Sequence, residues 1–122
     1  MRQMLNIPTM YQERLRAVYD HFKVLELGEY ELYLFGSYAK EAVKATSDID
    51  LLILLDKPLT PKEAKMLRMD LREDYEEQIH YRYEVDVKVY SKTRFLELAS
   101  KLSFESEIAK YMISLKEAVE GE

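Results

Sequence analysis

The sequence contains no cysteine, and only three glycines and three prolines among its 122 residues. The absence of cysteine excludes disulfide bonds, thiolate catalysis and thiolate metal ligands, and it suits a reducing compartment. Because glycine and proline interrupt regular elements, their scarcity predicts long helices and strands. Each glycine therefore calls for a local explanation.

Long apolar runs and an excess of positive charge are also absent. The longest uninterrupted apolar run is Leu51–Leu55, whereas a membrane-spanning helix needs roughly 20 residues. Residues 1–10 lack the basic and then apolar pattern of a signal peptide, so we expect a soluble, cytoplasmic protein without membrane contact. The 18 basic and 23 acidic residues give a net charge of −5, which argues against direct nucleic-acid binding. Any bound phosphate must then be held locally or through a metal ion.

What the sequence does contain is enough apolar material for one core. Hydrophobic residues make up 48% of the chain and charged residues 34%, which excludes a disordered chain of low hydrophobicity. A chain of this length supports one core. We therefore expect a single domain over residues 1–122.

Local signals predict alternating helices and strands. Thr9 with Gln12, and Thr60 with Glu63, form capping-box patterns, and Ser91 is a further candidate helix cap. The predicted elements are a helix over 10–25, a strand over 30–35, a short helix over 38–43, a buried strand over 48–55, a helix over 61–79, a strand over 83–90 and a helix to about 102. This order predicts an α/β (α+β) fold with a small mixed sheet of three to four strands and helices packed on it.

An apolar stripe at helical spacing follows near the C-terminus. It predicts a further helix, carrying Phe104, Ile108, Tyr111, Leu115 and Ala118. We expect the stripe to pack on the sheet of its own chain, with docking to another chain as the alternative. The basic and aromatic run His80–Tyr83 is interpreted as a strand edge or an interface rather than a single-strand binding site.

The first candidate for chemistry is the pair Gly36-Ser37, at the end of the first predicted strand. A glycine lets the backbone approach a ligand closely. A serine at the start of a helix would lie among free N–H groups and the positive end of the helix dipole, which favour a phosphate. The alternative is an ordinary turn.

Two aspartates lie at the start of the second predicted strand, with ten residues between Ser37 and Asp48. Asp48 and Asp50 are two positions apart, so a strand directs both side chains to one face. Aspartate is depleted in strands, and two carboxylates on one face repel each other. A divalent cation such as Mg²⁺ removes this repulsion and also binds substrate phosphates. The alternative is that Asp48 caps a turn and Asp50 pairs with a lysine.

A third carboxylate, Asp86, interrupts the valines of the third predicted strand. If this strand lies beside the second, Asp86 joins the metal site and can accept the proton of an attacking hydroxyl. The alternative is an exposed face on which Asp86 and Lys88 pair with neighbouring groups.

Together, Gly36-Ser37, Asp48-Ile49-Asp50 and the isolated Asp86 resemble the minimal nucleotidyltransferase family of the DNA polymerase beta-like superfamily, especially the antitoxins encoded beside HEPN-domain toxins. The resemblance implies the nucleotidyltransferase fold. It also implies that Gly36 and Ser37 hold the β- and γ-phosphates of a nucleoside triphosphate, and that Asp48 and Asp50 bind Mg²⁺. Asp86 would then be the third carboxylate and the base.

The chain departs from the family pattern after the glycine-serine pair. Relatives commonly continue with a small residue, arginine and glycine, where this chain has Ala39, Lys40 and Glu41. Lys40 keeps the positive charge and is a candidate nucleotide-binding residue. Glu41 adds an anion near the expected triphosphate. Lys44 and Lys88 are further candidate phosphate contacts, with a solvated or ion-paired role as the alternative.

The resemblance implies transfer of a nucleoside monophosphate, AMP from ATP, to a hydroxyl. We expect the acceptor to be a tyrosine of a partner HEPN toxin, which makes this chain an antitoxin. Since 122 residues leave no room for an acceptor-binding domain, the acceptor is expected to be another protein, or a small molecule held between subunits of a homo-oligomer. Two alternatives stay open: a non-catalytic antitoxin subunit with this fold, and a small-molecule nucleotidyltransferase that acts as a dimer.

Overall fold

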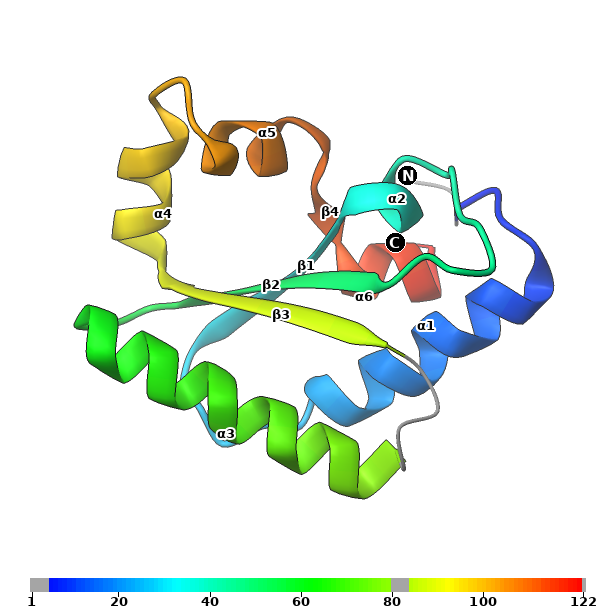
Figure 1. The fold of residues 1–122 in the computed structure, drawn as a ribbon, viewed down its shortest axis with the longest axis horizontal. Helices are drawn as coiled ribbons and strands as arrows, with labels where there is room; N and C mark the ends of the chain where they lie inside the picture. Colours follow the sequence, from blue (N-terminus) through cyan, green and yellow to red (C-terminus); the bar gives the residue numbers. More distant parts are fainter. Residues whose placement is uncertain (1–4, 80–83, 122) are drawn as a thin grey trace.

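The computed structural model describes residues 5–79 and 84–121, which form a four-stranded sheet with helices on both faces (Figure 1). The elements in chain order are α1 (Thr9–Phe22), β1 (Tyr30–Phe35), α2 (Gly36–Ala39), β2 (Ile49–Leu55), α3 (Pro61–Ile79), β3 (Val85–Ser91), α4 (Lys92–Ala99), α5 (Phe104–Tyr111), β4 (Ile113–Ser114) and α6 (Leu115–Glu120). The predicted fold class is confirmed. The run His80–Tyr83 lies outside the described residues, so its prediction stays untested.

The strand order is β3-β2-β1-β4. β1 runs antiparallel to both β2 and β4, whereas β2 and β3 are parallel. A parallel pair needs a long crossover connection, which α3 supplies. The mixed sheet therefore places the end of β1 at the same end of the sheet as the beginnings of β2 and β3, with β2 between the other two strands.

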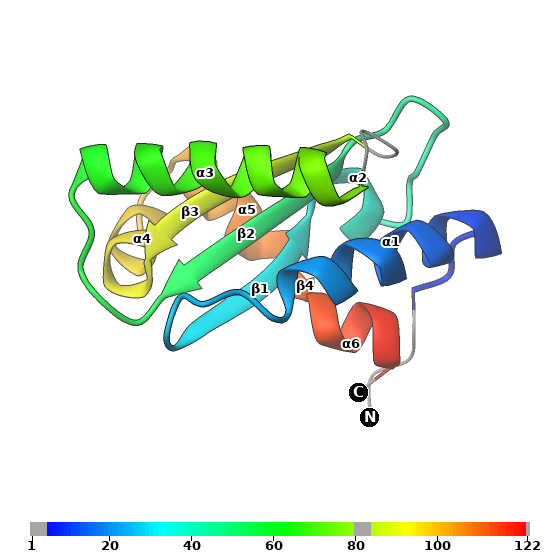
Figure 2. The ribbon, with the colours of Figure 1, turned by 90° about the horizontal axis from the view of Figure 1, so that it is seen from below.

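β2 lies in the middle of the molecule and contributes to two cores. Leu51, Ile53 and Leu55 are fully buried on one face, in the core that contains residues of α1, α3 and α6. Leu52 and Leu54 face the opposite side, where they pack with Phe95 of α4 and Ile108 of α5. Figure 2 shows α1, α3 and α6 on the near face of the sheet, and α4 and α5 behind it. Burial on both faces of β2 agrees with the prediction of a central strand.

Two of the predicted helix caps are confirmed. At the start of α3, the Glu63 backbone N–H donates to the Thr60 hydroxyl (3.1 Å), and the Thr60 N–H donates to the Glu63 carboxylate (2.9 Å). The Ser91 hydroxyl accepts a hydrogen bond from the Arg94 N–H (3.3 Å) at the start of α4. Both caps connect residues three positions apart, which is why the local sequence identifies them.

The predicted capping box of the first helix is wrong. α1 begins at Thr9 itself, after Pro8, and no side chain caps it. The Gln12 side-chain amide instead donates to the Ile7 carbonyl (2.8 Å), in the segment that precedes the helix. α1 also ends at Phe22, earlier than predicted, so Gly28 lies in the turn before β1.

The C-terminal stripe does not form a single helix. After α5, Met112 adopts an extended conformation (φ −66°, ψ 146°), and Ile113–Ser114 then pairs with β1 before α6 begins. Ile108, Leu115 and Ala118 are buried as predicted, whereas Phe104 and Tyr111 are exposed. Helical spacing alone could not show that a backbone pairing interrupts the stripe. In the described part of the chain, no helix combines the length and apolar character needed to cross a membrane.

Candidate active site

The glycine-serine pair lies where β1 turns into α2. The structure begins this helix at Gly36, two residues before the predicted start, and ends it at Ala39. Gly36 and Ser37 therefore belong to its first turn. Tyr38 is buried and places its ring edge-on to Tyr11 of α1, with the ring centroids 6.0 Å apart. This contact fixes the short helix against the body of the protein.

Position 36 requires a glycine for two reasons, its backbone conformation and the closeness of the Asp50 side chain. Its φ of +71° is a conformation that residues with a Cβ rarely adopt. Phe35, the residue before it, is the register partner of Asp50 on β2. A Cβ on Gly36 would overlap the Asp50 carboxylate and approach its Cγ to 3.0 Å. The glycine therefore leaves the space that the Asp50 carboxylate occupies.

The three predicted aspartates come together at one end of the sheet. Asp50 and Asp86 are register partners on the parallel strands β2 and β3, so their side chains share a face at a strand spacing of about 4.8 Å. Asp48 immediately precedes β2 and is exposed. Burial, followed by the negative charges of Asp86 and Asp48, raises the pKa of Asp50 to about 6, and Lys88 opposes this shift.

The oxygen donors suit a hard divalent cation such as Mg²⁺. Neither the Asp48 nor the Asp50 side chain makes a hydrogen bond or a salt bridge with another described residue, so neither shows the capping or lysine pairing considered as an alternative. Asp86, however, does pair with a lysine: its Oδ2 lies 3.3 Å from Lys88 Nζ. Among residues 5–79 and 84–121, no three His, Asp or Glu side chains are grouped as metal ligands. A cation bound by all three aspartates would have to replace Lys88 at Asp86.

The candidate phosphate-binding lysines have different surroundings. Lys40 follows α2 and places its Nζ 4.7 Å from the centre of the Tyr111 ring, a distance typical of a cation–π contact. Lys44 lies in the exposed connection to β2. Lys88 pairs with Asp86. Sequence reasoning missed Tyr111 as a residue near the site, because it treated this side chain as part of the core stripe and no local pattern connects it to Lys40.

Glu41 has the backbone conformation that favours glycine. Its φ is +58°, the one positive φ of a non-glycine residue in the described segments. This explains why a glycine suits the position in the family pattern. The Glu41 carboxylate accepts a hydrogen bond from the Asn6 backbone N–H, so it holds the segment before α1.

A comparison with models of protein families shows to which family the chain belongs. The family model described as "Nucleotidyltransferase domain" matches residues 15–115. The chain belongs to this nucleotidyltransferase family. The match includes Gly36, Ser37 and all three aspartates of the candidate site, whose individual roles remain predictions. No curated protein matches the chain.

A solved structure resembles this nucleotidyltransferase domain only distantly. It is described as "Crystal structure of the toxin-antitoxin with AMP-PNP", and it shares 16% sequence identity with a TM-score of 0.41. The likeness covers 89% of this chain and 82% of that chain. Similarity at this level says nothing about the function of this nucleotidyltransferase domain.

Proposed function

We propose that this nucleotidyltransferase domain transfers AMP from ATP, with Mg²⁺, to a tyrosine hydroxyl of a HEPN-domain toxin and thereby acts as an antitoxin. The observation that supports transfer chemistry is the position of the Asp50 carboxylate, which lies against Gly36 and in register with Asp86. This places acidic oxygens beside the first turn of α2. The identities of the nucleotide, the acceptor and the partner rest on the sequence resemblance.

The proposed roles combine these positions with the sequence resemblance. Gly36 and Ser37, with Lys40, hold the β- and γ-phosphates. Asp48 and Asp50 would hold Mg²⁺, which when bound would offset the negative charge of the triphosphate. The acceptor oxygen forms a bond to the α-phosphorus as the bond from this phosphorus to the pyrophosphate oxygen breaks. Asp86 accepts the hydroxyl proton, and pyrophosphate leaves. The protein contributes position and charge rather than a covalent intermediate.

The test is to incubate the purified chain with ATP, Mg²⁺ and the co-purified partner, and to measure the partner's intact mass. We expect an increase equal to one AMP moiety. Asp48→Asn and Asp50→Asn should each lower the initial rate at least about 100-fold, the loss typical when a group that stabilises transition-state charge is removed. The matched control is Asp70→Asn on the exposed surface of α3, which should leave the rate unchanged. An absent adduct, or one undiminished in Asp48→Asn, would contradict the catalytic proposal.

A non-catalytic antitoxin subunit is the second candidate, and the ion pair between Asp86 and Lys88 favours it. A lysine already offsets the charge of this carboxylate without a metal ion. Such a subunit would inhibit its partner without ATP and would still do so with both Asp50→Asn and Asp86→Asn. Inhibition that requires ATP and Asp50 excludes this candidate. Turnover on a small hydroxyl compound without a protein partner would instead support a small-molecule enzyme, and sedimentation would then show whether it is a dimer.

A further inference from the structure

β3 forms one edge of the sheet, and no described strand pairs with its outer side. The Ile49 N–H donates to the Glu84 carbonyl (2.9 Å), so even-numbered residues of this segment direct their backbone groups toward β2. Because successive residues of a strand point their N–H and C=O groups in opposite directions, Val85, Val87 and Val89 direct theirs outward. No described residue pairs with these outward groups, so the edge offers pairing positions for an additional strand. Val87 and Val89 are themselves only 5% and 6% exposed, so an added strand has to approach them between the neighbouring side chains of α3.

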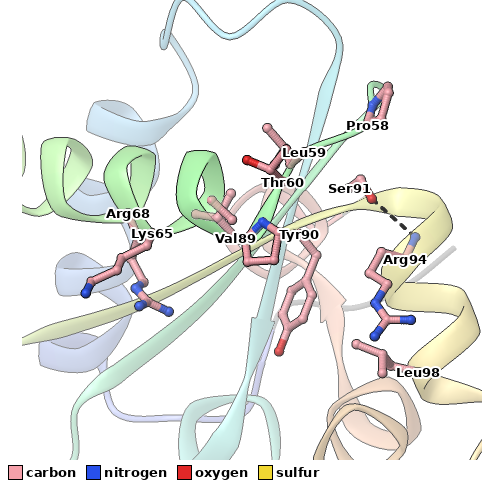
Figure 3. A pocket seen from close by; sticks show the side chains of 12 residues that line it. Pro58, Leu59, Thr60, Lys65, Arg68, Val89, Tyr90, Ser91, Arg94 and Leu98 are labelled. Carbon is pink, nitrogen blue, oxygen red and sulfur yellow. Dashed lines mark hydrogen bonds between the residues drawn. The ribbon is translucent and has the colours of Figure 1, made fainter.

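Two hollows follow this edge, one after the other. A cavity of about 380 Å³ lies between α3, the end of β3 and α4. Figure 3 shows Lys65 and Arg68 extending from α3 on one side of it, Arg94 and Leu98 of α4 on the other, and Tyr90 between them. A second cavity, of about 270 Å³, is lined by residues 85–88 of β3 and includes Asp86. Arg68 lines both cavities, so they are neighbours along β3, and we call the two together the edge groove. Its second cavity includes Asp86 of the candidate active site.

The walls of the edge groove are basic although the chain carries a net charge of −5. Lys65 and Arg68 make no salt bridge with any described residue. Arg94 and Arg72 also line the groove, and each pairs with a glutamate of its own helix. Between the basic side chains lie apolar ones, among them Leu59, Val89 and Leu98. The groove thus combines positive charge, apolar contact and free backbone hydrogen-bonding groups.

We propose that an extended, acidic segment of the acceptor protein binds in the edge groove as an added strand on β3 and carries the accepting hydroxyl to Asp86. This inference rests on the proposed function. Outward backbone groups at every second residue match an extended polypeptide, and the negative net charge disfavours a nucleic acid. Lys65 and Arg94 line the cavity at the end of β3, beside Ser91. The strand spans roughly 16 Å from Asp86 to Ser91. The carboxylates that pair with these basic side chains therefore lie about four to six residues from the accepting hydroxyl in the bound segment.

Binding of a defined peptide, without ATP, tests the groove separately from catalysis. The probe is a fluorescently labelled synthetic peptide with one tyrosine and, five residues away, three consecutive glutamates. Fluorescence anisotropy should detect its binding, and the same peptide with lysines in place of the glutamates should bind at least about tenfold more weakly. N-methylation of alternate backbone amides should also weaken binding, because a strand pair depends on those donors.

A charge reversal locates the binding surface. Arg68→Glu should weaken binding of the glutamate peptide about tenfold. The matched control is Lys116→Glu, which makes the same charge change on an exposed residue of α6, beside β4 at the opposite edge of the sheet, and should have no effect. Circular dichroism reports whether Arg68→Glu folds, and Arg68→Ala serves in its place if it does not.

Hydrogen exchange on the unmodified protein provides a measurement that needs no variant. The outward amides of Val87 and Val89 should exchange more slowly when the peptide is bound, while those of Asp86 and Lys88, directed toward β2, should change little. Unchanged exchange at Val87 and Val89, equal binding of the lysine peptide, or preferential and Arg68-dependent binding of a single-stranded RNA oligonucleotide would each overturn the proposal. If the peptide binds as expected but no AMP is transferred, the binding proposal is supported and the catalytic proposal is wrong. If AMP is transferred to a partner while the peptide does not bind, the catalytic proposal is supported and the binding proposal is wrong.

Discussion

Replacement of Gly36 by alanine tests the close approach between the turn after β1 and the Asp50 carboxylate. The chain contains its own control for this substitution, since Gly28 has the same φ of +71° but no atom within 4 Å of the position that an added Cβ would take. Gly28→Ala therefore measures the cost of the backbone conformation alone. Gly36→Ala measures that cost together with the displacement of Asp50.

The two costs can be approximated separately. A residue with a Cβ in the left-handed region loses about 1–2 kcal/mol, and this applies to both glycines. At Gly36 the added methyl group must also push the Asp50 side chain away from its rotamer, which costs about 0.5–1.5 kcal/mol. We expect Gly28→Ala to lower the free energy of unfolding by about 1–2 kcal/mol, and Gly36→Ala by about 1.5–3.5 kcal/mol.

Urea denaturation followed by circular dichroism at pH 7 measures both changes. A double-mutant cycle with Asp50→Ala then isolates the contact, because the methyl group meets no carboxylate once Asp50 is shortened. The coupling energy between Gly36→Ala and Asp50→Ala should be about 1 kcal/mol. A coupling energy of zero, with equal losses for Gly28→Ala and Gly36→Ala, would refute the close approach on which the candidate active site depends.

Three further outcomes are expected. The pKa of Asp50 is raised from 3.8 to about 6, so the folded protein binds a proton at this carboxylate more tightly than the unfolded chain does. The protonated Asp50 therefore contributes to stability below pH 4, and this contribution is lost as the pH rises through 6. Asp50→Asn should therefore raise the free energy of unfolding at pH 8, by at most roughly 3 kcal/mol, and flatten its dependence between pH 4 and 6 in urea titrations. Thr60→Ala removes the cap of α3 and should lower the free energy of unfolding, measured by thermal denaturation, by about 1 kcal/mol. An unchanged free energy of unfolding would contradict a stabilising role for the observed hydrogen bonds. Glu41→Gly relieves the positive φ but loses the contact with Asn6, so stability should change by less than about 1 kcal/mol. Because the Glu41 carboxylate is held by the Asn6 N–H, ATP affinity measured by calorimetry should be unaffected, and an increase would show that this carboxylate repels the triphosphate.

The sequence was sufficient for two of the three predicted helix caps and for the central strand. The capping box at Thr60 and Glu63 and the cap at Ser91 join residues three positions apart, and both are present. The apolar run of β2 likewise identified the central strand, because burial on both faces leaves no polar alternation. The first capping box failed because Gln12 found a closer partner, the Ile7 carbonyl, in the preceding segment.

Local sequence patterns could not predict contacts between distant segments of the chain. Nothing near residues 113–114 indicates that they pair with β1 and divide the expected C-terminal helix. The strand assignments placed Asp48 and Asp50 on one face of the second strand and Asp86 within the third, but only the register of β2 with β3 makes Asp50 and Asp86 neighbours. The contact of Lys40 with Tyr111 and the basic walls around Arg68 depend on side chains from separate elements, so periodicity could not reveal them.

The parallel pairing of β2 with β3 also bears on the order in which the protein folds. β1 and β2 are joined through the short segment that contains α2, whereas β3 reaches β2 only after the whole of α3. Closing the longer connection costs more chain entropy and gives contacts of greater sequence separation, so β3 is expected to dock after the β1–β2 pair has formed. A partly folded chain would then possess Gly36 and Asp50 in contact but lack Asp86 beside them. All three aspartates would be assembled only in the completed fold, which would keep immature chains from carrying out chemistry that depends on the third carboxylate.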